Sequence, residues 1–182
     1  MKIVAPMLIL ALAPLAAWGQ DGGEGQEPLD WRETAHALPK PPEERNLLAF
    51  RAGSQPLGRF LLDSASLSIG EDGVIRYTLV VRGGGASAAT FEGLRCASRE
   101  RKLYASLGRD GAWRPLGNSI WRALDGENSL AVFRYNGNDP RATLAHDYFC
   151  DGPVPARASE EIIGRLRGKR VDYLDPMSGA GP

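Results

Sequence analysis

Apolar and polar residues alternate most regularly in the segment VIRYTLVVR, residues 74–82. Ile75, Tyr77, Leu79 and Val81 fall on one side of this segment, and the residues between them are mostly polar. A period of two is typical of a β-strand with one face on the core and one wetter face. The pattern therefore predicts a strand over residues 74–82.

The preceding segment GRFLLDSASLSIG, residues 58–70, predicts a second strand with a kink at Asp63-Ser64. Asp72-Gly73 lies between the two strands, and this dipeptide favours the positive φ angles of a tight hairpin turn. We therefore expect residues 60–69 to pair with residues 74–82.

Further apolar segments bounded by turn residues predict three more strands, NLLAFRA (46–52), TFEGLRC (90–96) and RKLYASL (101–107). The glycine-rich GGGASAA (83–89) lacks the Gly-Lys-Ser/Thr ending of a phosphate-binding loop, so we interpret it as a flexible loop. Strands spaced roughly ten residues apart, with no helix between them, favour an antiparallel meander of about five to seven strands. Residues 119–138 do not distinguish a short helix from a strand.

The pattern changes at Asp139 and Pro140, a side-chain cap followed by a residue that needs no amide donor in the first helical turn. The apolar residues between 144 and 149 then fall on one helical face. Residues 158–169 predict a second helix, with acids in the first turn and bases in the last. The sequence thus predicts an α+β domain, in which one or two C-terminal helices pack on an antiparallel sheet.

The first 19 residues resemble a secretory signal peptide, with one Lys, an apolar run from Ile3 to Ala17 and small residues at Ala17 and Gly19. We expect cleavage before Gln20 and no lipid anchor, because no Cys follows the leader. The alternative, an uncleaved membrane anchor, fits less well because the run is short and contains two prolines. We therefore expect a periplasmic protein with no stable membrane insertion after cleavage.

The full chain has 182 residues, 43% of them apolar, and this length has room for one domain. Residues 20–45 are rich in Gly, Pro and charge and predict an extended arm, which Trp31 is expected to pin to the domain. We expect the globular domain to span residues 46–170 and a flexible tail to span residues 171–182. The 22 basic and 22 acidic residues balance, and this excludes the basic excess typical of nucleic-acid binding.

The chain has two cysteines, Cys96 and Cys150, and an even count in an oxidising compartment favours a disulfide. Such a bridge closes a loop of about 55 residues, worth roughly 4 kcal/mol on the chain-entropy model. The helix predicted over residues 140–149 places Cys150 at its C-terminus, where the dipole raises the pKa of a thiol and disfavours a Cys–His nucleophile with His146.

Metal and redox sites lack the residues that they need. The supply of soft ligands is the two cysteines with His36 and His146, and there is no Cys-x-x-Cys pair. We therefore expect no metal and no cofactor.

Carboxylates leave one catalytic alternative open, a periplasmic hydrolase acting on an envelope glycan or peptide through a pair of acids. Five acids lie in or beside predicted elements: Asp63, Asp72, Glu92, Asp139 and Asp147. Asp72 and Asp139 already have structural roles in a turn and a cap. The serine-hydrolase motifs Gly-x-Ser-x-Gly and Ser-x-x-Lys are absent from the sequence, and we assign no catalytic residue.

Aromatic residues suggest a binding surface for a sugar or a peptide. We name Tyr104, Trp113, Trp121 and Tyr148 as candidates, together with Arg76 on the wetter side of its strand. Core packing is the alternative explanation for the aromatic rings, because a sheet covered by helices needs large apolar side chains.

Several motifs in order resemble the CNP-one-like family of exported proteins of Gram-negative bacteria, whose function is uncharacterised. They are SLSIGEDGVIRYTLVV, FEGLRC, LYASLGRDGAW, Trp121 and LAHDYFC, and the resemblance covers roughly residues 31–168. The resemblance implies a small exported domain with a cysteine in each of FEGLRC and DYFC, and no established activity. From the compartment and the missing catalytic motifs we expect a non-catalytic envelope component whose partner is a protein, a peptide or a glycan.

Overall fold

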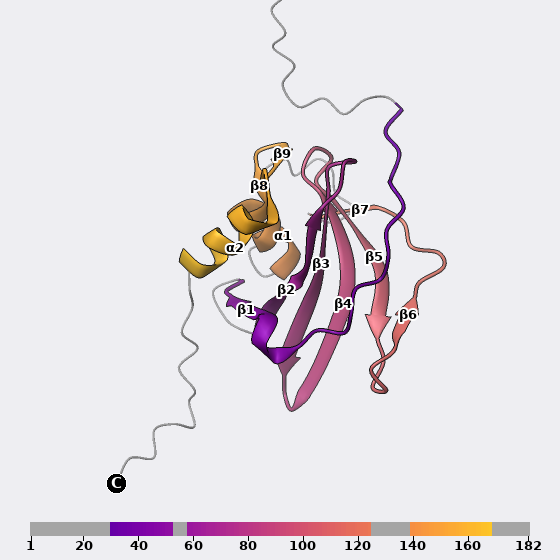
Figure 1. Cartoon of the computed structure of the whole chain (residues 1–182), viewed down its shortest axis with the longest axis vertical. Coiled ribbons are helices and arrows are strands. Elements are labelled where there is room, and N and C mark those ends of the chain that lie inside the picture. Colours follow the sequence, from indigo (N-terminus) through magenta and orange to yellow (C-terminus); the bar gives the residue numbers. More distant parts are fainter. Residues whose placement is uncertain (1–29, 53–57, 125–138, 169–182) are drawn as a thin grey trace, which may run out of the picture.

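The computed structural model describes residues 30–52, 58–124 and 139–168. An antiparallel sheet carries the C-terminal helices on one face, and an N-terminal arm, residues 30–43, crosses the other (Figure 1). The predicted α+β class, the meander and the packing of the helices are confirmed.

The strands of the sheet follow each other in sequence order from β1 to β6, and the short β7 also pairs with β5. Their bounds are β1 Leu47–Phe50, β2 Arg59–Ile69, β3 Val74–Gly83, β4 Ala86–Arg95, β5 Glu100–Leu107, β6 Trp113–Pro115 and β7 Arg122–Ala123. A short 3-10 helix, η1 (Glu44–Asn46), joins the arm to β1. Because neighbours in sequence are neighbours in the sheet, tight turns suffice as connections.

The predicted hairpin between β2 and β3 is confirmed, with Leu62 opposite Leu79. Gly73 closes its turn at φ 74°, a conformation that costs little only for glycine. The predicted kink is an irregularity in the register between Asp63 and Ser68. An irregularity of this kind bends a strand locally, as the predicted kink requires.

The flexible loop predicted over residues 83–89 was wrong for most of its length. Gly84 and Gly85 form a two-residue turn with φ of 57° and 77°, and β4 begins directly after it at Ala86. The ladder between β3 and β4 runs from Gly83 opposite Ala86 to Val74 opposite Arg95. Small residues such as Ser and Ala carry little strand signal, but the hydrogen bonds of β3 extend the strand through them.

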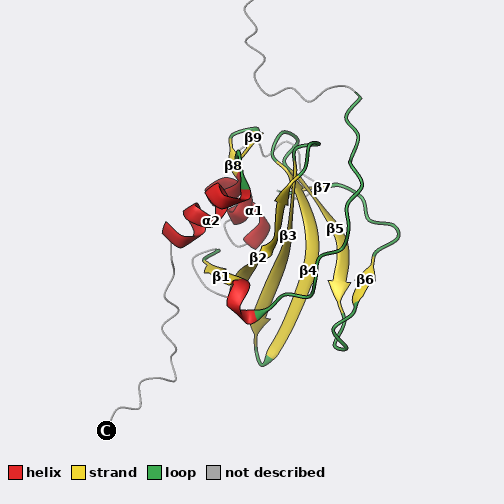
Figure 2. Cartoon of the chain, viewed as in Figure 1, coloured by secondary structure: helices red, strands yellow, loops and turns green. Residues whose placement is uncertain are grey.

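The helical layer begins where the sequence predicts it. The side chain of Asp139 accepts a hydrogen bond from the amide of Arg141 and caps α1 (Pro140–Leu144). The chain continues into a π-helical turn, η2 (Ala145–Phe149), and α2 (Ser159–Gly168) follows the small ladder of β8 (Cys150–Asp151) and β9 (Val154–Pro155) (Figure 2). The segment predicted as one helix therefore begins with α-helical geometry in α1 and continues with π-helical geometry in η2.

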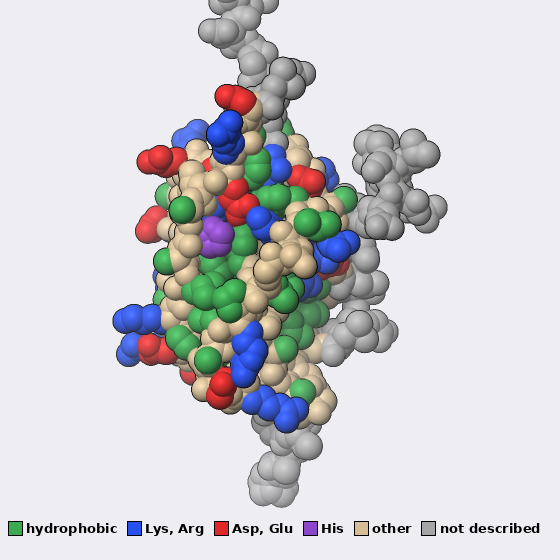
Figure 3. All heavy atoms as spheres, turned by 90° about the vertical axis from the view of Figure 1, so that its right-hand side faces the viewer, with side chains coloured by type: hydrophobic (Ala, Val, Ile, Leu, Met, Phe, Trp, Pro, Cys, Tyr) green, Lys and Arg blue, Asp and Glu red, His purple; other side chains and the backbone are tan. Residues whose placement is uncertain are grey.

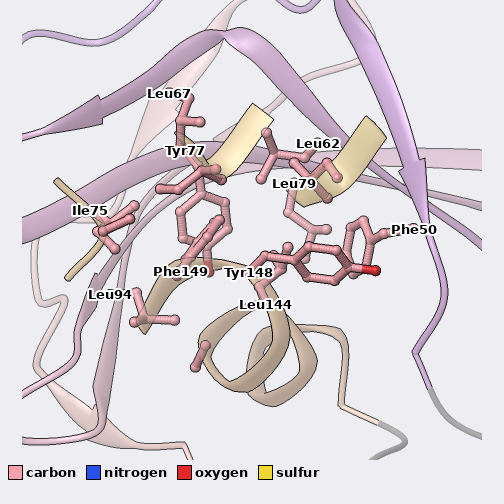
Figure 4. Close-up of a cluster of buried hydrophobic side chains, with 14 of the residues drawn as sticks. Phe50, Leu62, Leu67, Ile75, Tyr77, Leu79, Leu94, Leu144, Tyr148 and Phe149 are labelled. Carbon is pink, nitrogen blue, oxygen red and sulfur yellow. The ribbon is translucent and has the colours of Figure 1, made fainter. Parts of the chain in front are cut away.

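The main core lies between the sheet and these helices (Figure 4). Tyr77 of β3 meets Phe149 edge to face, with ring centroids 5.0 Å apart, and Phe50 of β1 meets Tyr148 at 6.0 Å. Both pairs join residues distant in sequence, so the sheet and the helices stabilise each other.

A disulfide fastens the helical layer to the sheet, as predicted. Cys96, directly after β4, is bonded to Cys150, the first residue of β8 directly after η2, and their Cα atoms are 5.7 Å apart. In the described ranges, no helix is both long and apolar enough to cross a membrane.

Candidate functional site

The side of the sheet opposite the helices holds the chemistry of the molecule. The name arm face is used here for this side, comprising the arm and the residues beneath it: Trp31, Glu33, Thr34, His36, Asp72, Arg76, Arg95, Lys102, Tyr104, Trp113 and Trp121. Viewed from the side of β5 and β6, apolar side chains gather in the middle of the surface, and most charged side chains surround them (Figure 3).

A glycine opens the floor of the arm face. Gly93 on β4 pairs with Arg76 on one side and with Lys102 on the other. A Cβ at this position would lie 2.3 Å from the hydroxyl of Tyr104, so only glycine allows the Tyr104 ring to lie across the strand. Tyr104 lies two residues after Lys102 on β5, so the alternation of the strand places both side chains on this side, next to the register irregularity opposite Phe91 and Glu92.

Glu33 of the arm is the centre of the cluster. Its carboxylate accepts hydrogen bonds from Lys102 Nζ at 2.8 Å, from the Tyr104 hydroxyl at 2.6 Å and from Trp121 Nε1 at 3.3 Å. The Arg76 guanidinium lies 3.8 Å away. Burial acts to raise the pKa of Glu33, but the hydrogen bonds from Lys102 and Tyr104 outweigh it and hold the pKa below its ordinary value. Glu33 is therefore an ionised group inside a ring of donors.

Asp72, in the β2–β3 turn, is the second anion. Both of its oxygens bond to Arg76, at 3.2 and 2.7 Å, and Thr34 donates to it from its amide and its hydroxyl. Burial opposes ionisation here too, yet the bonds from Arg76 and Thr34 hold the pKa of Asp72 well below its usual range. The turn residue predicted from Asp72-Gly73 thus also anchors the arm.

The three tryptophans of the described residues all donate indole hydrogen bonds between the arm and the sheet. Trp31 Nε1 donates to the carbonyl of Asp72, Trp113 Nε1 to the carbonyl of Pro39, and Trp121 Nε1 to Glu33. The predicted role of Trp31 in pinning the arm is therefore seen directly. Indole rings suit the contact between the arm and the sheet, which is partly apolar and partly solvated, because each ring has one polar N–H group.

Cationic side chains lie over aromatic rings where the arm contacts the sheet. The guanidinium of Arg95 lies 3.6 Å from the centre of the Trp31 ring and 5.3 Å from that of Trp121. Lys102 lies 5.6 Å from the Tyr104 ring and 5.8 Å from the Trp121 ring. Each such contact favours a cation over an aromatic face. The combination of cations, rings and polar donors is one that receives anionic groups.

The wetter face predicted for the strand over 74–82 is covered in the structure. Arg76 is only 4% exposed, because the arm and the Asp72 turn lie over it. A pattern of alternating polarity identifies the second face correctly, but it cannot show that a distant segment buries that face.

The structure brings four of the five predicted surface residues to one side. Arg76, Tyr104, Trp113 and Trp121 belong to the arm face, whereas Tyr148 lies in the main core on the opposite side of the sheet, 3% exposed. Core packing thus explains Tyr148.

Sequence reasoning missed Glu33, Arg95 and Lys102. Only Glu33 carried a signal in the sequence, as an acid two residues from Trp31, the predicted anchor of the arm. The register that places Lys102 opposite Gly93 was needed to connect them.

The five candidate acids do not converge on a shared cleft. Glu92 is fully buried and is held by two hydrogen bonds from Arg141, at 2.7 and 2.6 Å, and Asp139 caps α1. Asp147 contacts His146, and Asp63 is buried at the bulge, where burial raises its pKa. Glu92 and Asp139 share the guanidinium of Arg141, which lies 3.7 Å from the Asp139 carboxylate, so these two acids are held by a cation.

The residues of HDYFC close the helical layer. Cys96 and Cys150 line a cavity of about 210 Å³ together with His146, but both sulfurs are in the disulfide, and the described residues contain no free thiol. No group of three or more His, Cys, Asp or Glu side chains within the described part of the chain is placed to hold a metal ion.

Comparison with known protein families identifies a matching family. The family model described as the CNP1-like family matches residues 26–167, a span that includes both the arm and the helical layer. No curated protein and no solved structure matches the chain.

Proposed function

The chain belongs to the CNP1-like family, and we propose that it is a non-catalytic binding component of the cell envelope whose partner is a protein, a peptide or a glycan. The observation that carries this proposal is the convergence of Lys102, Tyr104, Trp121 and Arg76 on one carboxylate, that of Glu33. A ring of cationic, hydroxyl and indole donors beside aromatic faces is the typical composition of a site for acidic groups.

The periplasm is the proposed compartment. The leader-like residues 1–19 direct the chain there, and the disulfide between Cys96 and Cys150 suits an oxidising environment. After removal of the leader the protein is proposed to have no stable membrane insertion. A binding component in this place meets envelope proteins, peptides and glycans.

Hydrolysis by a pair of acids receives less support from the geometry. Glu33 and Asp72 both lie beside Arg76, but the pKa of each is lowered, so neither keeps the proton that a general acid must donate. Asp63 has a raised pKa, but it lies at the register irregularity of β2, and only 2% of the residue is exposed to solvent. The acids of the arm face therefore act as anchors.

The proposal is tested by crosslinking in intact periplasm followed by affinity capture of the chain. The wild type is compared with a Lys102→Ala/Trp121→Ala variant of the arm face. The matched control is Val154→Ala/Arg157→Ala, which also removes one apolar side chain and one cation, both exposed and neither of them an arm-face residue.

We expect one set of partners to be captured by the wild type and by the control, and to be lost with the arm-face variant. Equal capture by all three chains would remove the arm face as the binding site. Cleavage of an envelope glycan or peptide by the purified protein, with no partner captured, would replace the binding proposal with the hydrolase.

A further inference from the structure

We propose that the arm is a built-in ligand of the sheet residues of the arm face, and that the partner presents an extended peptide with the same pattern, an aromatic residue followed two positions later by a carboxylate. This inference rests on the proposed function and names the chemistry of its ligand. Residues 31–34, Trp-Arg-Glu-Thr, show how such a peptide is held.

The arm lies on the sheet as a bound peptide does. Trp31 and Glu33 point toward the sheet and are partly buried, whereas Arg32 between them is exposed. This alternation is that of an extended segment whose every second side chain enters a site. Thr34 fixes the backbone, because its amide donates to Asp72 and its carbonyl accepts from Arg76.

The two inward side chains meet different surroundings. The Trp31 ring lies under the Arg95 guanidinium and edge-on to Trp121, with ring centroids 5.8 Å apart. Glu33 enters the ring of donors around Lys102 and Tyr104. The site thus accepts a flat aromatic ring at one position of the peptide and an anion two residues later, and this is the spacing required of a ligand.

Side chains rather than a backbone ladder hold the arm. Among the described residues, no backbone–backbone hydrogen bond joins residues 30–42 to the sheet. Every hydrogen bond from Trp31, Glu33 and Thr34 to the sheet uses at least one side chain. A segment held in this way can be replaced by another of the same pattern without unzipping a strand.

Attachment in the same chain makes the arm a strong competitor. A tethered segment acts at an effective concentration of about millimolar, so a free peptide of equal affinity binds the intact protein poorly. Weakening the arm by mutation must therefore increase the affinity for a peptide added in solution.

The probe is a fluorescein-labelled peptide of residues 30–38, DWRETAHAL, and its binding to the full-length chain is followed by fluorescence anisotropy. Three chains are compared: the wild type, the arm-release variant Trp31→Ala/Glu33→Gln, and arm-release with Lys102→Met added. We expect the arm-release variant to bind the peptide at least about tenfold more tightly than the wild type, with most of this gain lost on adding Lys102→Met.

A peptide with glutamine in place of its glutamate is the matched ligand control and is expected to bind about tenfold more weakly. Near-UV circular dichroism and a cooperative urea transition establish that each variant is folded. A folded arm-release variant that binds neither peptide, or binds both equally, would overturn the inference.

We assign the pattern to a different protein, and gel filtration of the wild type over a range of concentrations tests this assignment against a second copy of this chain. A dimer that Lys102→Met abolishes identifies a second copy exchanging arms. A monomer that binds the peptide after arm release identifies a different protein as the source. If no peptide binds while periplasmic capture still depends on Lys102 and Trp121, the inference fails and the proposed function stands.

Discussion

Single residues decide the shape of the arm face, and Gly93 is the clearest case. The missing side chain at this position lets Tyr104 cross β4 and reach Glu33 with its hydroxyl. The absence of a side chain at Gly93 thus makes room for the Tyr104 hydroxyl that binds the Glu33 carboxylate. The sequence gives no sign of this role, because a glycine inside a strand pattern also marks bulges and weak spots.

Gly93→Ala is expected to destabilise the protein by about 1–3 kcal/mol, the usual cost of overpacking, because the added methyl group meets the Tyr104 ring. Urea denaturation measures the change. Gly164→Ala is the control, since nothing lies within 4 Å of its Cβ in α2 and alanine favours a helix by about 0.5–1 kcal/mol. A neutral Gly93→Ala would show that Tyr104 has room to move.

Asp63 shows how a buried acid without a cation behaves. Burial raises its pKa, and so its charge destabilises the folded state increasingly as the pH rises above the ordinary value of about 3.9. We expect Asp63→Asn to increase the free energy of unfolding at pH 7 and to have little effect at pH 3. Asp110→Asn is instead expected to decrease the free energy of unfolding at pH 7, because the hydrogen bond from Arg114 lowers the pKa of Asp110. A loss of stability at pH 7 in Asp63→Asn would contradict this account.

At the scale of elements, an ion pair and a disulfide help to attach the helical layer to the sheet. The ion pair between Glu92 of β4 and Arg141 of α1 lies at one end, and the disulfide from Cys96 to Cys150 lies after η2. α1 has only five residues, too few to be stable alone, so its position depends on these tertiary contacts.

Arg141→Met is expected to cost about 3–5 kcal/mol in the free energy of unfolding, because it leaves the fully buried carboxylate of Glu92 without its cation. Adding Glu92→Gln should recover much of this loss. Breaking the exposed pair of Arg114 and Asp110 with Arg114→Met serves as control and should change the urea midpoint little. Equal effects of the two single variants would show that the buried pair holds nothing in place.

Loss of the disulfide is expected to cost up to roughly 4 kcal/mol on the chain-entropy model, measured as the urea midpoint of Cys96→Ala/Cys150→Ala against the oxidised wild type. Mass spectrometry before and after reduction with alkylation establishes the bridge itself in protein purified from the periplasm. Two thiols alkylated without a reductant would refute it.

The elements were largely predictable because their signals are local. The alternation of residues 74–82, the Asp72-Gly73 turn and the cap at Asp139 each act over a few neighbouring residues, and all three are found in the structure. The start of β4 was missed, because its small residues become a strand only through the hydrogen bonds of β3.

At the scale of the whole molecule, the site was only half predictable. Polarity and ring type singled out Arg76, Tyr104, Trp113 and Trp121, but not the arm acid Glu33 that unites three of them. That acid lies 69 positions from Lys102 in the sequence, and no local pattern carries information over such a separation. The placement of the arm is set by packing of the whole molecule.

The attachment of the arm should weaken in acid. Glu33 and Asp72 both have lowered pKa values, so the stability that they contribute is present above their ordinary values, near pH 4, and is lost as the pH falls through the lowered ones. The free energy of unfolding of Glu33→Gln/Asp72→Asn should therefore fall less steeply than that of the wild type below pH 4.5. An equally steep fall in both chains would contradict this, and Glu71→Gln, which changes an exposed neighbour, is the control.

The indole groups report whether the arm moves as one unit. Trp31, Trp113 and Trp121 each donate an indole N–H hydrogen bond between the arm and the sheet. Exchange of these protons with solvent is resolved by NMR. In Glu33→Gln the loss of charged hydrogen bonds costs about 1.5–3 kcal/mol, which corresponds to exchange faster by roughly ten- to a hundredfold. If the arm is a single replaceable segment, all three indoles accelerate together. Acceleration confined to Trp121 would mean that the arm is held at independent points, and a partner peptide would then have to displace them one by one.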